Sequence, residues 1–408
     1  MRCRFCNKEL RQLFVSLGSA PLSNAYIKKE QLARKEPLYP LDVYVCDNCL
    51  LVQLPEFESP ENIFSDYAYF SSCSETWMRH CEEYADKMFK DYGINKKSRI
   101  VEIASNDGCL LQYFMRKGAN VLGIEPAVNV AETARKKNVP TETAFFGART
   151  AKRLACEGKT ADLLIGNNVL AHVPDLNDFV QGLSILLNPN GMITMEFPHL
   201  ARLIEGRQFD TIYHEHFSYF SFLTAEKVFF SHSLVIFDVE ELPTHGGSLR
   251  IYVKHKNDGT KPISERVHKM LDKETKSGYA DITNYFAFDE KVKKARCELL
   301  SFLGKIRYDG KTIVGYGAAA KGNTMLNYCG IKNDLIDYVA DISPHKQGRF
   351  MPGSRIPIVS PDRIRQTKPD YILILPWNIK EEIMRQLSYV RDWGGSFIIP
   401  IPELEVIR

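Results

Sequence analysis

The stretch that decides the fold is residues 99–114, RIVEIASNDGCLLQYF. It begins with a β-branched run, passes through a polar turn that contains one glycine, and continues into a helical pattern. Three further β-branched runs and two helical pieces follow this pattern: runs at 120–126, 162–170 and 191–197, and helices at 109–118 and 130–138. Alternating strands and helices predict a parallel sheet covered by helices. Residues 99–196 are therefore expected to form an α/β domain.

A second alternating block lies near the end of the chain. It starts with KTIVGYGAAAKGNTMLNY at residues 311–328. Its other strand-like runs are LIDYVAD at 335–341, YILILPW at 371–377 and SFIIP at 396–400. Between the two blocks lie an apolar run at 234–255 and a charged helical region at 264–306. The blocks are too dissimilar to form a repeat, so they predict two separate α/β units.

The bulk composition is that of an ordinary soluble enzyme. The chain has 408 residues, of which 44% are hydrophobic and 25% charged, and this length favours two or three domains. A net charge of +3 gives no broad basic field, so no nucleic-acid partner is expected. The N-terminus, MRCRFCNKEL, has no apolar signal region, and the chain has no run of about 18 apolar residues. We therefore expect a cytoplasmic protein that does not enter a membrane.

Two cysteine pairs near the N-terminus form a candidate metal site. Cys3 and Cys6 make one CxxC pair, and Cys46 and Cys49 make a second. Each pair brings two sulfur atoms close enough to bind one ion, and four thiolates complete the closed tetrahedral shell of structural zinc. The gap of 39 residues between the pairs exceeds the commonest ribbon spacing. The alternative is four unrelated buried cysteines; the paired spacing favours a structural Zn²⁺ ion that folds the module and does not catalyse.

The turn within residues 99–114 is a candidate nucleotide-binding site. Its glycine lets a ligand approach the backbone, and the helix N-terminus that follows is partly positive. Glu125 ends the second strand, where an acid commonly accepts hydrogen bonds from ribose hydroxyls. The turn lacks the GxGxxG spacing of dinucleotide sites, and this favours S-adenosylmethionine over NAD. The candidate cofactor-binding residues are Glu102, Ser105, Asn106, Asp107, Gly108, Glu125 and Asn167. A flavodoxin-like turn with an unrelated ligand is the alternative.

Four motifs behind the cysteine pairs carry a resemblance to a known family. They are VEIASNDG, YHEHFSYFS, HGGSLR and GYGAAAKGNTMLN, in this order. Together they resemble the zinc-containing sugar C-methyltransferases of deoxysugar biosynthesis, which add a methyl branch at C3 of a nucleotide-linked 4-keto sugar. The resemblance spans nearly the whole chain. It implies an S-adenosylmethionine-dependent enzyme whose small-molecule partner is a nucleotide sugar, with thymidine as the usual nucleoside.

The resemblance also implies an α/β fold class with three named parts. These are an N-terminal zinc-binding module, a class I (Rossmann-like) methyltransferase domain and a C-terminal Rossmann-like domain, with the nucleotide sugar held between the last two. The expected divisions are residues 1–65 for the zinc module, 66–200 for the methyltransferase domain, 201–305 for an active-site and connecting region, and 306–408 for the C-terminal domain.

The motif at residues 211–221, TIYHEHFSYFS, is the candidate catalytic centre. Hydrogen on a carbon beside a ketone is acidic, and a histidine with a pKa near 6.5 suits its removal at neutral pH. By resemblance His216 is that base, and His172 is another position brought to the sugar. Tyr213 is suited to donate to an oxyanion, and Glu215 to orient an imidazole or bond a sugar hydroxyl or amine. If residues 214–216 formed a strand, both histidines would share a face, which allows a metal site as an alternative.

Other residues are candidates for covering the methyl donor. In similar enzymes the region YAYFSSCSETW covers the donor, which makes Tyr67 and Ser74 candidates. Ser72 or Ser74 would also serve as a helix N-cap in a plain linker, and we weigh these two interpretations evenly. Phe146 lies where class I methyltransferases set an apolar wall beside adenine, although an aromatic residue there is also a common core residue.

The second glycine-rich turn and HGGSLR are the candidate substrate-binding elements. GYGAAAKG departs from GxGxxG, which argues against a dinucleotide and favours the single nucleoside diphosphate of a nucleotide sugar. The candidate residues are Gly317, Lys321 and Asn323 for the diphosphate, Asp341 for the ribose, and His245 and Arg250 from HGGSLR. For HGGSLR a plain hairpin turn is the alternative.

The sequence thus predicts enolisation followed by in-line methyl transfer to C3 of a nucleotide-linked 4-keto-6-deoxysugar. One rival is a nucleotide-sugar epimerase or other enolising enzyme that uses no methyl donor. Glu102 and Glu125 beside SNDG argue against it, since such an enzyme needs no ribose-binding acid in that domain. A second rival is a non-catalytic nucleotide-sugar-binding or zinc-ribbon protein, which would leave the polar cluster at 213–216 without a purpose. The sequence does not determine the oligomeric state of the protein.

Overall fold

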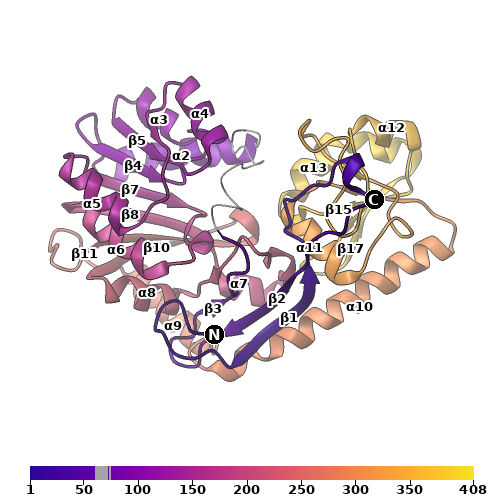
Figure 1. Cartoon of the computed structure of the whole chain (residues 1–408), viewed down its shortest axis with the longest axis horizontal. Helices are drawn as coiled ribbons and strands as arrows, with labels where there is room; N and C mark the ends of the chain where they lie inside the picture. Colours follow the sequence, from indigo (N-terminus) through magenta and orange to yellow (C-terminus); the bar gives the residue numbers. More distant parts are fainter. Residues whose placement is uncertain (60–71, 73–74) are drawn as a thin grey trace.

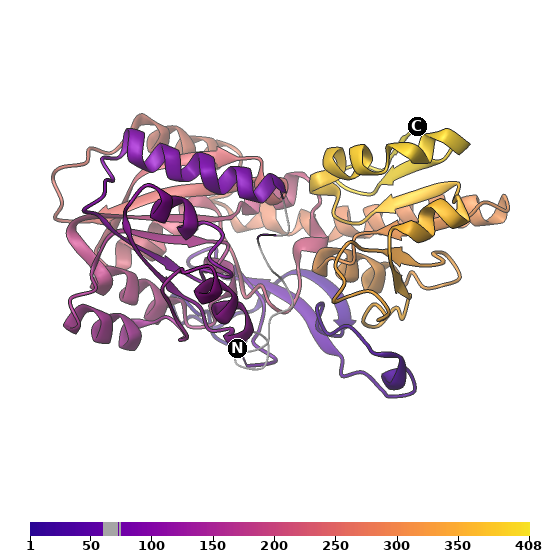
Figure 2. The same ribbon diagram turned by 90° about the horizontal axis from the view of Figure 1, so that it is seen from above.

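The computed structural model describes residues 1–59, 72 and 75–408. Two α/β lobes lie side by side, and a ribbon of two N-terminal strands runs from the larger lobe to the smaller one (Figures 1 and 2). The described strands form three sheets, of four, seven and six strands. The division into a small N-terminal module and two α/β units confirms the predicted fold class.

The seven-stranded sheet forms the larger lobe. Its strands are β4 (Arg99–Ile103), β5 (Asn120–Ile124), β6 (Thr141–Glu142), β7 (Ala161–Asn167), β8 (Leu187–Pro198), β10 (Leu234–Leu242) and β11 (Ser248–His255). The order is β10-β11-β8-β7-β4-β5-β6, with β11 antiparallel to both neighbours and the other pairs parallel. The interior strand β4 is buried at four of its five residues, as expected for a strand in a sheet that helices cover.

Helices of this lobe follow the strands as the alternating pattern predicted. They are α2 (Glu75–Asp91), α3 (Leu111–Arg116), α4 (Val128–Lys136), α5 (Ala148–Cys156), α6 (Leu176–Leu186), α7 (Leu200–Glu205), α8 (Phe222–Ser231) and α9 (Glu265–Lys276). The expected helix at 109–118 is shorter than its pattern, because residues 104–110 form the turn that leaves β4. The sheet continues past residue 200 through β10 and β11, so part of the expected connecting region belongs to this lobe.

The six-stranded sheet forms the C-terminal lobe. Its strands are β12 (Ile313–Tyr316), β13 (Val339–Ala340), β14 (Ile358–Val359), β15 (Tyr371–Ile374), β16 (Ser396–Ile399) and β17 (Glu405–Ile407), and its helices are α11 (Ala320–Cys329), α12 (Asp362–Thr367) and α13 (Lys380–Gln386). The order β14-β13-β12-β15-β16-β17 is the Rossmann order, with the last strand antiparallel. The predicted Rossmann-like turn therefore follows the first strand of a Rossmann-like sheet.

The N-terminal strands and one long helix join the two lobes. The strands β1 (Gln12–Ala20), β2 (Tyr39–Val45), β3 (Val52–Gln53) and β9 (Ser218–Tyr219) form the four-stranded sheet, and the helix is α10 (Ala287–Tyr308). Phe14 of β1 stacks on Phe288 of α10 at 4.7 Å between ring centroids and meets Tyr285 edge-on. Figure 1 shows α10 running below the C-terminal lobe beside β1. Across the described parts of the chain, the search for a helix long and apolar enough to cross a membrane found none.

The aromatic contact between β1 and α10 gives a test of how the parts are held together. Phe14 is 1% exposed, so Phe14→Ala should lower the free energy of unfolding by about 3–5 kcal/mol through lost burial and a residual cavity. Denaturant unfolding followed by far-UV circular dichroism would measure this loss. The matched control is Tyr308→Ala, because Tyr308 is 91% exposed and its change should stay within about 0.5 kcal/mol. Equal effects of the two changes would contradict this account of the core.

Candidate active site

One cavity of about 1580 Å³ opens between the two lobes. The carboxyl ends of the parallel strands in both sheets point toward it, which is where open α/β sheets bind ligands. Side chains from the seven-stranded lobe, the C-terminal lobe and the N-terminal segment all line its wall, Asn24 among them. The cavity is large enough for two ligands of nucleotide size.

Most of the residues singled out in the sequence meet in this cavity. Those that line it are Asn106, Asp107, Glu125, Phe146, Asn167, His172, Tyr213, Glu215, His216, His245, Gly317, Lys321 and Asp341. Those that do not are Glu102, Ser105, Gly108, Arg250 and Asn323. Tyr67 and Ser74 lie outside the described residues. The structure therefore gathers predicted residues that stand up to 235 positions apart in the sequence, from Asn106 to Asp341.

The turn after β4 forms one end of the cavity. Asn106 adopts a left-handed backbone conformation with φ of 49° and donates its backbone N–H to Glu125 at 2.9 Å. Asp107 pairs with Lys137 through Oδ2 at 2.8 Å, while its buried Oδ1 has no hydrogen-bond partner among the described residues. Asn167 Oδ1 is likewise buried and without a partner there. These oxygens are acceptors that a bound ligand with donor groups would satisfy.

Three predicted residues of this turn lie behind the cavity wall. Gly108 has φ of 74°, and a Cβ added to it would lie 2.8 Å from Cγ2 of Val139, so the chain needs glycine here for the turn itself. Ser105 is buried at the base of the turn. Burial raises the pKa of Glu102 well above its ordinary value. These residues support the turn and do not face the cavity.

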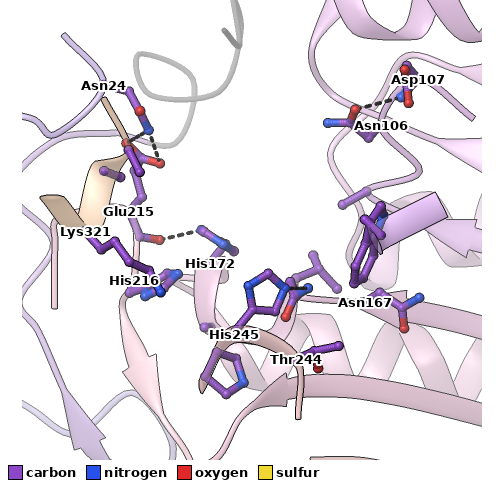
Figure 3. Close-up of a pocket in the computed structure, with 18 of the residues that line it drawn as sticks. Asn24, Asn106, Asp107, Asn167, His172, Glu215, His216, Thr244, His245 and Lys321 are labelled. Carbon is purple, nitrogen blue, oxygen red and sulfur yellow. Dashed lines mark hydrogen bonds between the residues drawn. The ribbon is translucent and has the colours of Figure 1, made fainter. Parts of the chain in front are cut away.

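His216 lines the cavity beside Lys321 and has a defined tautomer (Figure 3). Its Nδ1 lies 2.8 Å from the carbonyl oxygen of Thr211 and must donate to it, because a carbonyl only accepts. Nε2 then accepts a hydrogen bond from the Tyr213 hydroxyl at 2.9 Å. Burial, with a contribution from His172, lowers the pKa of His216 well below its ordinary value. The site thus holds a neutral imidazole whose Nε2 accepts a proton.

Two further histidines surround His216. The ring centroids of His172 and His216 are 4.7 Å apart, and Nδ1 of His172 donates to the backbone carbonyl of Glu215 at 2.8 Å. His245 accepts at Nε2 from Nδ2 of Asn168 at 2.9 Å. Burial lowers the pKa of His172 and of His245 to about 4. All three rings are therefore neutral at pH 7, and the cluster carries no repulsion between imidazolium ions.

Glu215 and His214 point in different directions. The Glu215 carboxylate accepts from Nδ2 of Asn24 at 2.7 and 2.9 Å, and burial raises its pKa to about 7. His214 turns away and donates through Nε2 to the carbonyls of Tyr39 and Pro40, each at 3.2 Å. Residues 214–215 form a turn and not a strand, so the condition for a shared face is not met. The search of the described residues for possible metal-binding groups found none that includes these histidines.

Lys321 comes from the first turn of α11 and extends toward His216 (Figure 3). Its Nζ donates to Asn378 at 2.7 Å and lies 4.7 Å from the centroid of the Trp377 ring. Burial lowers the pKa of Lys321, while the buried carboxylate of Asp210 opposes this. Burial raises the pKa of Asp210 to about 6, and Trp377 donates to it at 2.7 Å. No sequence motif pointed to Asp210 or Trp377 as residues of the site.

The remaining residues of the second turn differ in exposure to the cavity. Asp341 accepts backbone N–H groups from Ala318 at 2.7 Å and Ser343 at 2.8 Å. Gly317 has φ of 87°, and an added Cβ would lie 2.5 Å from Pro376. Asn323 is fully buried, does not line the cavity, and has no side-chain partner among the described residues. A direct contact from Asn323 to a diphosphate thus has no geometric support here.

Arg250 differs from its expected role as a substrate-binding residue. It is 4% exposed and pairs with Glu196 at 2.8 Å, directly across the β8–β11 ladder. Burial tends to raise the pKa of Glu196, but His80 and the Arg250 charge outweigh it and lower the pKa to about 2. HGGSLR lies partly in the connection between β10 and β11 and partly in β11 itself, which begins at Ser248. Pro243, Thr244 and His245 of this connection line the cavity, whereas Arg250 lies within strand β11 and does not.

The four cysteines converge as their spacing predicted. Their Sγ atoms all lie within 4.8 Å of one another, with 3.6 Å between Cys3 and Cys49 and 3.5 Å between Cys6 and Cys46. Tetrahedral zinc with Zn–S bonds of about 2.3 Å places sulfurs about 3.8 Å apart, so the residues fit this ion. Four thiolates fill the coordination shell. A metal held here would stabilise the module that carries β3.

Comparison with known proteins places the chain in a family. It is 36% identical over 405 residues to the C-methyltransferase NovU of Streptomyces niveus, covering 99% of this chain and 96% of that protein. The chain belongs to the C-methyltransferase family. Three family descriptions match in order: a zinc-binding domain at residues 3–64, a methyltransferase domain at 75–229, and a C-methyltransferase C-terminal domain at 243–402. The resemblance inferred from the motifs is thereby confirmed.

More distant matches cover a smaller share of this C-methyltransferase. The ubiquinone biosynthesis O-methyltransferase of Rhizobium etli is 28% identical over 149 residues, covering 34% of this chain and 56% of that protein. Among solved structures, the magnesium protoporphyrin IX methyltransferase of Synechocystis with bound S-adenosylmethionine matches with a TM-score of 0.34 and 14% identity. That match covers 43% of this chain and 78% of the other.

The C-methyltransferase is thus an S-adenosylmethionine-dependent enzyme with a small-molecule substrate and a zinc-binding module. This excludes the two rival interpretations, a donor-free enolising enzyme and a non-catalytic binding protein. Whole-chain similarity to NovU carries this conclusion. The family descriptions name a transfer to carbon and leave the acceptor molecule open.

The cysteine cluster gives a direct test of the metal. Cys46→Ser should remove the bound zinc and unfold the N-terminal module, because structural zinc contributes roughly 10–16 kcal/mol in small zinc-folded peptides. Elemental analysis of the purified protein would report zinc per chain, and thermal unfolding would report the loss of stability. Cys156→Ser is the control, because Cys156 is exposed and lies outside the cluster. Full zinc occupancy in Cys46→Ser would contradict the proposed ligand set.

Proposed function

We propose that this C-methyltransferase methylates C3 of a thymidine-diphosphate-linked 4-keto-6-deoxysugar for branched-chain deoxysugar biosynthesis. The observation that carries the proposal is the neutral His216, whose Nε2 is a hydrogen-bond acceptor on the wall of a cavity shared by two nucleotide-type turns. A carbon nucleophile requires loss of a C–H proton, and a carbon beside a ketone loses it most readily. The resemblance to sugar C-methyltransferases is the reason for proposing a sugar as the methyl acceptor.

His216 is the proposed base. Its low pKa keeps the imidazole neutral across the neutral pH range, and the hydrogen bond to Thr211 holds Nε2 toward the cavity. When Nε2 takes the proton from C3, a negative charge forms on the ketone oxygen. That charge favours the imidazolium form, so the base becomes stronger as the enolate develops.

The enolate oxygen needs donors nearby. The Tyr213 hydroxyl lies against His216, within hydrogen-bond reach of Nε2. His172 also packs on His216, but its one N–H is donated to the Glu215 carbonyl, so Tyr213 is the nearer donor. A hydroxyl displaced from Nε2 by the reacting carbon can rotate toward the oxyanion. The Lys321 ammonium also extends into this region and adds a positive charge. Glu215, with a carboxylate on the cavity wall, is the proposed contact for a sugar hydroxyl or amine.

The turn after β4 is the proposed site for S-adenosylmethionine, which supplies an electrophilic methyl group when bound. Asp107 Oδ1 and Asn167 Oδ1 are buried acceptors without partners among the described residues, and this fits a ligand rich in donors. Glu125 faces the cavity beside them and is the proposed acceptor for ribose hydroxyls. Phe146 lines the same end and offers an apolar surface for adenine.

The C-terminal turn is the proposed site for the nucleoside diphosphate. Gly317, Lys321 and Asp341 line the cavity on this side, at the carboxyl ends of β12 and β13. The Rossmann order of the sheet supports this location, because such sheets bind nucleotides where the strand order reverses. The sugar would then extend from the diphosphate toward His216, between the two lobes.

The reaction itself is the first test. The purified protein is incubated in D₂O with the thymidine-diphosphate 4-keto-6-deoxysugar, with and without S-adenosylmethionine, and the sugar is analysed by mass spectrometry and NMR. A gain of one methyl at C3 that requires the donor is the expected result. A methyl at C5, the other carbon beside the ketone, would correct the position. If sugars that vary at C2 and C3 all fail to gain a methyl, a nucleotide-sugar substrate is refuted.

The role of His216 is tested by His216→Asn. Loss of the base should lower the methylation rate by roughly 10²- to 10⁴-fold, while S-adenosylmethionine binding, measured by calorimetry, stays near the wild-type value. The asparagine keeps a polar group of smaller size and lacks the proton acceptor. His268→Asn is the matched control, because His268 is exposed on α9, and its rate should equal that of the wild type. A wild-type rate in His216→Asn would remove this residue from the base role.

A further inference from the structure

Asn24 reaches the active site from the N-terminal part of the chain, between β1 and β2. It lines the cavity, and its Nδ2 lies 2.7 and 2.9 Å from the two carboxylate oxygens of Glu215. Within the part of the chain that the structure describes, it is the only side chain that donates a hydrogen bond to this carboxylate. Figure 3 shows the two side chains facing each other at one side of the cavity.

The segment that carries Asn24 is anchored on the C-terminal lobe. The hydroxyl of Tyr26 donates to the carbonyl of Ala318 at 2.6 Å, beside the second glycine-rich turn. Ile27 forms an antiparallel bridge with Phe350 through two backbone hydrogen bonds of 3.0 and 2.9 Å. These contacts hold the chain on the C-terminal side of Asn24, and strand β1 holds it on the N-terminal side. Its position is therefore set by the fold and not by Glu215 alone.

The carboxylate of Glu215 depends on this contact for its charge. Glu215 is 3% exposed, and an ionised carboxylate without a donor at such a site is strongly disfavoured. Burial raises its pKa to about 7, and the hydrogen bond from Asn24 opposes this rise. With the Asn24 amide present, the Glu215 carboxylate at pH 7 can still accept a hydrogen bond from a ligand. Without the amide, the neutral acid would prevail.

Other titratable groups around Glu215 do not replace Asn24. They are Tyr26 on the same segment, His172 after β7, His216 on the next turn, Lys321 on α11 and Lys346 after β13. His172 contacts only the backbone carbonyl of Glu215 in the described hydrogen bonds. Lys346 donates to the Ala318 carbonyl and lies 3.5 Å from Asp341. Asn24 is thus the group whose loss bears most directly on this carboxylate.

We propose that Asn24 is a positioning residue that keeps the Glu215 carboxylate ionised and turned toward the sugar, where it accepts a hydrogen bond from a ring hydroxyl or amino group. This inference rests on the proposed nucleotide-sugar substrate. It assigns to the N-terminal module a direct part in substrate selection. The module would then complete the active site in addition to its structural contribution.

Kinetics of Asn24→Leu and Asn24→Asp test the proposal. In Asn24→Leu the kcat/KM for the sugar should fall roughly 10- to 100-fold, the worth of one hydrogen bond to a charged group. The loss should lie mainly in KM, because the substituent does not react. The acidic limb of the pH profile should move up by about one unit, since removing a donor raises the pKa of a carboxyl group. Asn24→Asp should move it further, because two adjacent carboxylates disfavour ionisation.

A matched control separates this effect from loss of an ordinary amide contact. Nδ2 of Asn188 donates to Asp162 at 2.7 Å, away from the cavity. Asn188→Leu removes the same kind of hydrogen bond and should leave kcat, KM and the pH profile unchanged. Sugars that lack one ring hydroxyl or amino group at a time add a second check. For the analogue without the recognised group, wild type and Asn24→Leu should have equal kcat/KM; a persistent difference for every analogue would overturn the substrate-selection role.

A substrate-independent titration distinguishes this inference from the proposed function. Infrared difference spectra between the wild type and Glu215→Gln report the Glu215 carboxyl, whose pKa in the wild type is expected at about 7. The difference spectrum between Asn24→Leu and the double variant Asn24→Leu/Glu215→Gln should give a higher titration midpoint for the Glu215 carboxyl group. An unchanged midpoint would overturn the Asn24 role whatever the substrate is. A raised midpoint with no methylation of any nucleotide sugar would refute the proposed function alone. Zinc content and S-adenosylmethionine binding confirm that the variants are folded.

Discussion

The hydrogen bond from His216 Nδ1 to the Thr211 carbonyl is the interaction on which the active site depends. It selects the tautomer in which Nε2 is an acceptor, and it fixes the ring plane within the cluster of imidazoles. The short turn from Thr211 to His216 makes this bond possible, because the chain doubles back before it enters β9. Strand β9 then pairs with β3 of the N-terminal module, which holds the end of that turn. The geometry of His216, the proposed base, is therefore tied to the N-terminal zinc-binding module.

Two mainly parallel sheets face one cavity, and this arrangement suits the proposed binding of two nucleotide-like ligands. Each sheet places polar side chains and glycines at the carboxyl ends of its strands, and each contributes one wall. The catalytic turn lies between them and belongs to neither Rossmann-type unit. Burial in this position keeps the histidines neutral and raises the pKa of Glu215 and Asp210. The same desolvation strengthens any electrostatic contact made with a developing charge.

Prediction from sequence succeeded where the signal is local. Strands β4, β5 and β7 followed from β-branched runs, and the cysteine cluster followed from two CxxC pairs, because spacing alone fixes what those residues can do. It failed for Arg250, whose guanidinium pairs with Glu196 across a β-ladder. A cross-strand partner depends on register between distant segments, which no local pattern encodes. Asp210 and Trp377 were missed for the same reason, since their contact joins residues 167 positions apart.

By itself the sequence determined the α/β class and the four-cysteine cluster, because these depend on residue type and short-range spacing, and it also contained the motif with the proposed base. Only the tertiary structure decided which residues share the cavity and in which protonation state. His214 and His216 are two positions apart, yet a turn sends one to a backbone carbonyl and the other to the cavity. Asn24 carries no motif, and its contact with Glu215 arises because an N-terminal segment packs against the C-terminal lobe. Burial and long-range packing, which set pKa values and partners, exist only in the folded chain.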